Sequence, residues 1–401
     1  MKRHHIFGLV FLAACLQWLS CCSVDEAKLQ IAALKPPKTH HAGEPYLFTD
    51  ANKHVFLSWI ESSDTLSQLT LSTLQEGHWS DPVVITSGTN WFVNWADYPL
   101  VTGEGNGNML AHILDRSGPG KFSYDVKVTT TSNGVNWSTL QLLHDDGLEA
   151  EHGFVSMIPY GKDVFISWLD GRNTVGDDGA VHTGHDHHGE MTLRAAVVTY
   201  SGEKLQEWEL DSRTCDCCQT TAAITANGPV VIYRDRSDDE VRDISIVRYV
   251  NNQWTAPQSI FNDNWTINGC PVNGPRCEVE GNTLGLAWFT MADNQAEVKV
   301  IFSSDGGASF GKPFRVSGED CIGRVDLVML NETTAMLSWM ESGGIWVRSV
   351  STDGVMSKPV KVADSSDARA SGFPQLTRYE NGVLMAWTDA ATKTIQTAII
   401  N

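Results

Sequence analysis

Cysteine residues form a dense group of potential metal ligands in this chain of 401 residues. Three of the six cysteines beyond residue 22 lie within four positions, as Cys215, Cys217 and Cys218. A run this dense indicates a metal site, a redox centre or a local crosslink rather than core packing. Thiolates are soft ligands that select Cu(I) or Zn(II). We therefore take these three residues as candidate ligands for copper or zinc, with Cys270 as a further one.

A histidine-rich segment lies upstream of the cysteine run. It contributes four imidazoles, from His182, His185, His187 and His188. Imidazole suits both zinc and copper, so these four residues are candidate metal ligands as well. Histidine-rich tracts can also arise from composition alone, and a solvated loop is the alternative interpretation.

The first 22 residues are typical of an export signal. A basic start precedes a mostly apolar stretch over residues 6–19, which is too short to span a bilayer as a resident helix. We expect lipid attachment at Cys22 or Cys21, which would give a lipoprotein of the periplasm or outer membrane. Ordinary secretion is the alternative. Residues 23–401 are then expected to form a single domain that meets the membrane only through its lipid.

Disulfides compete with the metal interpretation because an exported protein can form them. Cys215 or Cys217 could pair with Cys270, and Cys277 with Cys321. Three clustered thiols beside several histidines exceed what a structural crosslink needs, which favours a metal. Redox chemistry is the third alternative.

A short apolar strand that often ends in Trp and an acidic residue recurs along the whole chain. Its spacing of roughly 50 to 65 residues is within the range of propeller blades. Gly and Asn punctuate the strands, which predicts an all-β chain. We expect a β-propeller of four-stranded blades, with seven blades favoured and six as the alternative, in which an N-terminal strand completes the last blade. The seven copies cover residues 54–61, 109–115, 164–170, 229–235, 284–288, 335–341 and 383–389.

The propeller arrangement predicts where the unusual residues meet. Links between blades and the loops after each second strand open on the same face of a propeller. The histidine-rich segment belongs to the third repeat, the cysteine run opens the fourth, and Cys270 opens the fifth. We therefore expect the metal-ligand candidates to be neighbours on one face.

Residues 303–310 carry a second signature, Ser-Ser-Asp-Gly-Gly-Ala-Ser-Phe. This turn resembles the Asp-box of sialidase-like propellers, the BNR-repeat superfamily, and residues 130–137 form a weaker copy. In the motif, the Asp caps the turn, Gly takes a positive φ and the aromatic ring packs beneath. The chain is similar to that superfamily over nearly all of residues 23–401. Its Cys-Asp-Cys-Cys-Gln run also resembles a subgroup of bacterial exported proteins labelled exo-α-sialidase.

The resemblance implies an alternative function, the cleavage of sialic acid or a related acidic sugar. Such enzymes bind a carboxylate with arginines and use a Tyr–Glu nucleophile pair with an Asp acid or base. Asp97, Asp115, Asp170 and Arg236 are the candidate catalytic residues here. No arginine stands at residues 43–47, where the superfamily places one near the first blade, and we identify no Tyr–Glu pair in the sequence.

The formal net charge of −19 limits the partners. So acidic a chain is not expected to bind nucleic acid or an anionic membrane surface. We expect a monomer whose ligand is a metal ion or a small acidic sugar. A non-catalytic propeller that binds a ligand is the third functional alternative, because fold does not fix function.

Overall fold

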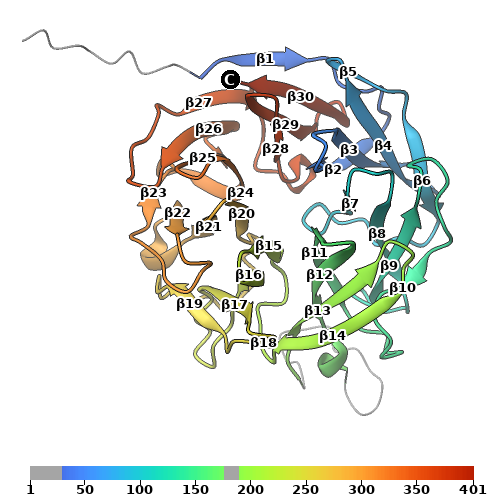
Figure 1. Ribbon diagram of the computed structural model, residues 1–401, viewed down its shortest axis with the longest axis horizontal. Helices are drawn as coiled ribbons and strands as arrows, with labels where there is room; N and C mark the ends of the chain where they lie inside the picture. The colour runs from blue at the N-terminus through green and yellow to red at the C-terminus, as the bar shows by residue number, and fades with distance from the viewer. Residues whose placement is uncertain (1–28, 176–188) are drawn as a thin grey trace, which may run out of the picture.

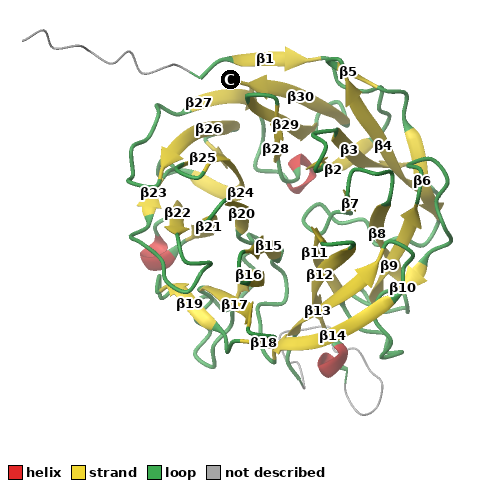
Figure 2. Ribbon diagram, in the orientation of Figure 1, coloured by secondary structure: helices red, strands yellow, loops and turns green. Residues whose placement is uncertain are grey.

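The computed structural model describes residues 29–175 and 189–401, which form seven antiparallel sheets arranged as blades around a ring (Figure 1). Secondary structure in this part of the chain is almost entirely strand (Figure 2), and the exceptions are three 3-10 helices of three residues each. These helices are η1 (Arg172–Thr174), η2 (Ala292–Asn294) and η3 (Arg369–Ser371). The predicted all-β propeller of seven blades is confirmed.

The first four blades follow one another along the chain, and their first strands lie nearest the centre in Figure 1. Blade one contains β2 (Ala42–Thr49), β3 (Val55–Ser62), β4 (Ser67–Gln75), β5 (His78–Trp79) and β6 (Val83–Gly88). Blade two contains β7 (Val101–Gly103), β8 (Met109–Arg116), β9 (Tyr124–Thr131) and β10 (Gln141–Leu142). Blade three contains β11 (His152–Tyr160), β12 (Asp163–Asp170), β13 (Thr192–Thr199) and β14 (Lys204–Asp211). Blade four contains β15 (Thr221–Thr225), β16 (Gly228–Arg234), β17 (Ile244–Val250), β18 (Gln253–Trp254) and β19 (Gln258–Phe261).

The remaining blades complete the ring. Blade five contains β20 (Arg276–Glu280), β21 (Thr283–Thr290), β22 (Glu297–Ser303) and β23 (Phe314–Arg315). Blade six contains β24 (Cys321–Asn331), β25 (Thr334–Glu341), β26 (Gly344–Ser351) and β27 (Val360–Asp364). Blade seven contains β28 (Gln375–Tyr379), β29 (Gly382–Asp389), β30 (Thr394–Ile400) and, from the N-terminal side, β1 (Ile31–Leu34).

The N-terminal strand supplies the outer edge of blade seven, as the sequence predicts. β1 pairs antiparallel with β30, from Ile31 opposite Ile400 to Leu34 opposite Thr397. The main chains of Gln30 and Asn401 extend the ladder, with N···O distances of 2.7 and 3.0 Å. The two ends of the described chain are therefore joined in one sheet (Figure 1).

The repeated Trp-x-acidic pattern has a structural explanation. Trp59, Trp168 and Trp339 are among the largest fully buried side chains, and each lies in the second strand of its blade. Their indole nitrogens donate hydrogen bonds to the carboxylate two residues later, over 3.0, 2.8 and 2.6 Å respectively. A buried indole N–H needs an acceptor. The acidic residue at the strand end therefore satisfies the tryptophan in these three blades.

The turn over residues 303–310 has the predicted Asp-box geometry. Asp305 accepts hydrogen bonds from Ser309 through its main-chain nitrogen at 2.9 Å and its hydroxyl at 2.6 Å. Gly306 and Gly307 have φ angles of 68° and 81°, and Phe310 packs against the core of blades four and five. This turn joins β22 to β23 and serves blade folding.

The leader expected at residues 1–22 lies outside the described residues. The described ranges contain no helix of the length and apolar character needed to cross a membrane.

Candidate metal centre

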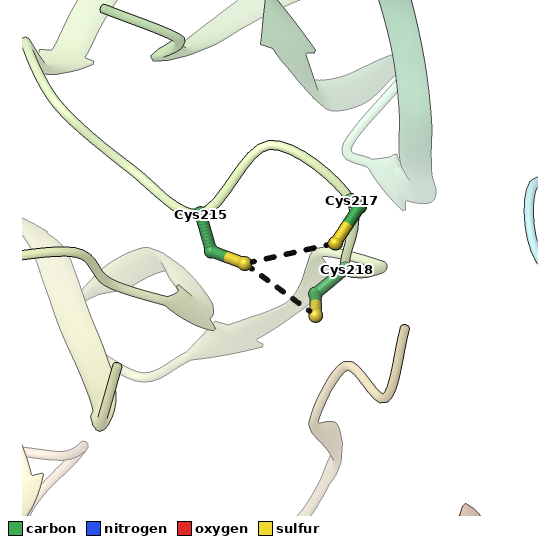
Figure 3. Close-up of side chains that lie close together, drawn as sticks. All are labelled: Cys215, Cys217 and Cys218. Carbon is green, nitrogen blue, oxygen red and sulfur yellow. Dashed lines mark hydrogen bonds between the residues drawn. The ribbon is translucent and has the colours of Figure 1, made fainter. Parts of the chain in front are cut away.

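The sulfurs of Cys215, Cys217 and Cys218 converge in the link between β14 and β15, at the start of blade four (Figure 3). Cys215 Sγ lies 3.9 Å from Cys217 Sγ and 3.7 Å from Cys218 Sγ, and all three cysteines are free. Four sulfurs placed tetrahedrally at the zinc–sulfur bond length of about 2.3 Å would be about 3.8 Å apart. The sulfur spacing therefore matches that of a tetrahedral thiolate site.

Cys270 reaches this cluster from the link that opens blade five. Interaction with the Cys217 thiol lowers the pKa of Cys270. The two links touch directly, because Gln219 Oε1 accepts a hydrogen bond from Gly274 N at 2.8 Å. A Cβ added at Gly274 would lie 2.2 Å from the main-chain oxygen of Gln219. A residue without a side chain is therefore needed where the Cys270 link crosses the cysteine run.

Two buried arginines surround the cluster with positive charge. Arg242 Nη1 lies 3.2 Å from Cys215 Sγ, and its Nη2 donates to Glu240 Oε2 at 2.8 Å. Arg234 is 1% exposed and donates to the main-chain oxygens of Arg242, Asn273 and Phe289. These carbonyl contacts fix the Arg234 guanidinium but carry no compensating negative charge. Thiolates in the cluster would supply that charge.

The four thiols differ in how readily they ionise. Burial raises the pKa of Cys215 to about 11. The hydrogen bonds that Cys217 donates to its sulfur neighbours hold its pKa well above the usual range. Burial opposes ionisation of Cys218, but hydrogen bonds from Cys215 and Cys217 and the nearby Arg234 charge outweigh it, so its pKa is well below the usual range. The cluster therefore combines a thiolate with protonated thiols that donate to it.

The histidine candidates His182, His185, His187 and His188 lie outside the described residues. Met191, which follows this segment, accepts a hydrogen bond from Thr214 N at 2.9 Å, directly before the cysteine run. Glu190 Oε2 lies 3.4 Å from Arg213 Nε and 3.7 Å from Arg236 Nη1. The segment's C-terminal flank is therefore held next to the cysteines.

Two of the candidate catalytic residues are engaged in ion pairs on different blades. Asp115 is the penultimate residue of β8 and lies 2.5 Å from Lys127 Nζ. Arg236 forms a bidentate pair with Glu240, with distances of 2.7 and 3.1 Å to Oε1. Glu240 also binds Arg242, so the charged run after β16 forms an ion-pair network that borders the cysteine cluster.

The other two candidates are buried. Asp170 is 0% exposed, accepts from Trp168 Nε1 at 2.8 Å and pairs with Arg172 at 2.7 Å. Asp97 is also buried, accepts a hydrogen bond from Phe154 N at 2.8 Å, and burial raises its pKa to about 7. The contacts of Asp97, Asp115, Asp170 and Arg236 do not join them into one constellation.

The structure contains a Tyr–Glu pair that the sequence analysis missed. Tyr124 Oη donates to Glu151 Oε1 at 2.8 Å, and burial together with the Glu151 and Asp97 carboxyls raises the pKa of Tyr124. Burial raises the pKa of Glu151 to about 8. Tyr124 is fully buried and its ring stacks on Phe92 at a centroid distance of 4.1 Å. Tyr124 and Glu151 are separated by 27 positions, which leaves no local spacing by which a sequence pattern could identify the pair.

Comparisons with known proteins show the fold and not a family. No family model matches the chain, and no curated protein matches its sequence. Among solved structures, the fold is similar to the BP39L lectin from Burkholderia pseudomallei, with a TM-score of 0.61 and 12% identity over 90% of this chain and 96% of the lectin.

Two carbohydrate-active enzymes have related folds. Polysaccharide lyase Uly1 matches with a TM-score of 0.54 and 10% identity over 92% of this chain and 90% of the lyase. The α-L-arabinofuranosidase arb93a of Fusarium graminearum, in complex with an iminosugar inhibitor, matches with a TM-score of 0.50 and 10% identity over 92% of this chain and 96% of the enzyme. At these identities the likeness is one of fold, and the function must be argued from the site.

Proposed function

We propose that this protein binds a soft metal ion, Cu(I) or Zn(II), through Cys215, Cys217, Cys218 and Cys270. The single observation that carries the proposal is the convergence of three free sulfurs, with Cys215 Sγ 3.9 Å from Cys217 Sγ and 3.7 Å from Cys218 Sγ. A disulfide would need a sulfur–sulfur separation of about 2.05 Å. The observed separations are those of ligands around an ion.

Charge compensation supports the same proposal. Four thiolates around Zn(II) carry a net charge of −2, and around Cu(I) a net charge of −3. Burying such a charge is costly unless cations lie close by. Arg242 contacts Cys215, and the Arg234 charge acts on Cys218. The buried guanidiniums therefore suit an anionic metal–thiolate centre.

The expected export of the chain to the cell envelope supports a role for the proposed metal site. The leader residues favour an exported chain with lipid at Cys22 or Cys21. A soft-metal site on such a domain would capture copper or zinc at the cell envelope, for storage, delivery or redox chemistry. Mass spectrometry of the protein released from membranes tests the lipid and identifies the modified cysteine.

Metal content of residues 23–401, purified without oxygen, tests the proposal. We expect about one equivalent of copper or zinc, lost when Cys217 and Cys218 are replaced by serine. Cys277→Ser is the matched control, because Cys277 lies in β20 with its sulfur 3.4 Å from Thr221 Oγ1 and outside the cluster. Absence of stoichiometric metal together with disulfide pairing of all six cysteines would refute the proposal.

Glycoside hydrolysis is the second candidate function. The observation that favours it is the pair of carboxyls, Asp97 and Glu151, that lie near Tyr124 and have raised pKa values. A carboxyl that keeps its proton near neutral pH can act as a general acid. The test is hydrolysis of a fluorogenic sialoside. Activity that resists chelators and is abolished by Arg236→Ala would favour hydrolysis over metal binding.

A further inference from the structure

A stacked pair of histidines lies between blades two and three. His144 is in the link between β10 and β11, and His152 is the first residue of β11. Their ring centroids are 3.7 Å apart with an interplanar angle of 11°, and their side chains are 3% and 0% exposed. All four ring nitrogens are therefore withdrawn from bulk water and depend on protein groups or an ion.

One carboxylate contacts both rings on one side. Asp146 Oδ2 lies 3.1 Å from His144 Nδ1 and 3.0 Å from His152 Nε2, and Leu148 N holds its other oxygen at 2.8 Å. An ionised carboxylate only accepts hydrogen bonds, so each of these ring nitrogens carries a proton. In neutral His144, Nε2 is then a lone-pair donor, whereas His152 Nδ1 becomes one only when an ion displaces its proton.

These two nitrogens face a second carboxylate. Asp125 Oδ1, from β9, lies 3.5 Å from His144 Nε2 and 3.9 Å from His152 Nδ1. The buried His144 Nε2 has no hydrogen-bond partner. His152 Nδ1 donates a hydrogen bond to the main-chain oxygen of Tyr124 at 3.3 Å, so a bound ion must displace that proton. Electron-rich atoms thus converge here, which is an arrangement that a cation stabilises.

We propose that Asp125, His144 and His152 bind a divalent cation of borderline softness such as Zn(II), with Asp146 positioning both imidazoles. Two imidazoles and a carboxylate are a ligand set that zinc accepts, with a fourth position left for water or another ligand. A carboxylate on the far side of a ligating histidine fixes its tautomer. The two ring planes must open from their near-parallel stack so that both lone pairs meet one ion.

The charge around the histidines agrees with a divalent cation. Asp170 Oδ1 lies 3.7 Å from His152 Nε2. Arg172 Nη2 lies 2.7 Å from Asp170 and 3.3 Å from Asp146. The three carboxylates of Asp125, Asp146 and Asp170 face one guanidinium, which leaves two negative charges once an ion has displaced the second proton of His152. A bound cation would offset them and would connect β9 of blade two to β11 of blade three.

Co(II) titration of a variant that lacks the other candidate ligands tests this site separately from the cysteine cluster. In that background serine replaces Cys215, Cys217, Cys218 and Cys270, and asparagine replaces His182, His185, His187 and His188. We expect one equivalent of Co(II) to bind with visible d–d absorption, to be displaced by Zn(II), and to bind at least tenfold more weakly after His144→Gln. His54→Gln, which alters an exposed histidine paired with Asp50, is the control and should change nothing.

Imidazole ¹⁵N NMR of the unsubstituted chain is a second test, which does not depend on folding of the eightfold-substituted variant. We expect Zn(II) to shift the resonances of His144 Nε2 and His152 Nδ1 while His144 Nδ1 and His152 Nε2 remain protonated. A His152 ring that stays doubly protonated near neutral pH in excess zinc would overturn the proposal and assign the cluster a purely structural role. Cobalt binding that is indifferent to His144→Gln would overturn it equally.

Discussion

At the scale of single residues, the protonation states of the cysteines determine how the cluster can bind a metal ion. Cys215 and Cys217 hold their protons strongly, because burial and donated hydrogen bonds raise their pKa values. Cys218 ionises easily because it accepts hydrogen bonds and lies near Arg234. Metal ligation needs thiolates, so an arriving ion must displace the protons of the first two residues.

Proton release on metal binding follows from this distribution. Near pH 7 we expect Zn(II) to displace the protons of Cys215 and Cys217 but none from Cys218. The count should therefore be about two to three, depending on Cys270, and below the four of an unperturbed site. Calorimetric titration in buffers of different ionisation enthalpy measures it. Release of four protons, or of none, would contradict the assigned protonation states.

At the scale of elements, the cluster depends on two links that cross. The link into blade four carries Cys215, Cys217 and Cys218, and the link into blade five carries Cys270. Gln219 joins them, since its side chain accepts a hydrogen bond from Gly274 N at 2.8 Å, and it also donates to Ala96 O at 2.5 Å in the link into blade two. Contact between the links, rather than any single strand, therefore holds the fourth sulfur in place.

Gly274→Ala should separate the two links. Its Cβ would lie 2.2 Å from Gln219 O and 2.6 Å from Gln219 N, both main-chain atoms that cannot rotate away. We expect a loss of about 1–3 kcal/mol in unfolding free energy and at least a tenfold weaker metal affinity, measured by chelator competition. Gly269→Ala is the control in the same link, because its Cβ would meet only Ile267 Cγ1 at 3.9 Å. Equal effects of the two substitutions would refute this role for Gly274.

The strands and links also show how much of the structure can be predicted from the sequence. The Trp-ended repeat predicts seven blades because burial of each indole requires the same strand pattern, and the blade order places Cys270 near the cysteine run. Contacts between particular side chains could not be predicted in the same way. The pairing of Tyr124 with Glu151, and of His144 with His152, depends on contacts between neighbouring blades. No spacing along the chain encodes these contacts, so the sequence analysis assigned no role to any of the four residues.

At the scale of the whole molecule, buried carboxyls spread over several blades couple folding to pH. Burial raises the pKa values of Glu44, Asp97 and Glu278 to about 7 and of Glu151 to about 8. Each group keeps its proton in the folded chain at pH values where the unfolded chain has already lost it. Their stabilising contribution is therefore full below about pH 4 and is lost as pH rises through about 7 to 8.

Stability should accordingly decline from mildly acidic to mildly alkaline pH. We expect the unfolding free energy to fall by a few kcal/mol between about pH 5 and pH 8, as measured by urea denaturation. Glu151→Gln should flatten the upper part of this decline, because the amide cannot ionise and its oxygen still accepts from Tyr124. Exposed Glu149→Gln is the control and should leave the slope unchanged. A rise in stability over this range would contradict the assigned pKa directions.

Closure of the ring by β1 is a second feature that affects the whole molecule. β1 comes from the N-terminal side of the chain, whereas the other three strands of blade seven come from its C-terminal end. Thr397 Oγ1 donates a further hydrogen bond to Leu34 O at 2.9 Å. Removing residues 29–34 leaves β30 as an open edge, which promotes association between chains. We expect a chain that begins at residue 35 to unfold at lower temperature and to associate in sedimentation experiments.

A chain that begins at residue 29 is the matched control for that truncation, because it keeps β1 entire. β1 and β15 lie on opposite sides of the ring (Figure 1), so the cysteine cluster beside β15 should survive the shorter truncation and bind metal with unchanged stoichiometry. Lower thermal stability at constant metal content would show that ring closure stabilises the propeller as a whole and leaves the blade-four junction formed. Equal unfolding temperatures for the two truncated chains would instead show that hydrogen bonds to β1 add nothing to the stability of the closed ring.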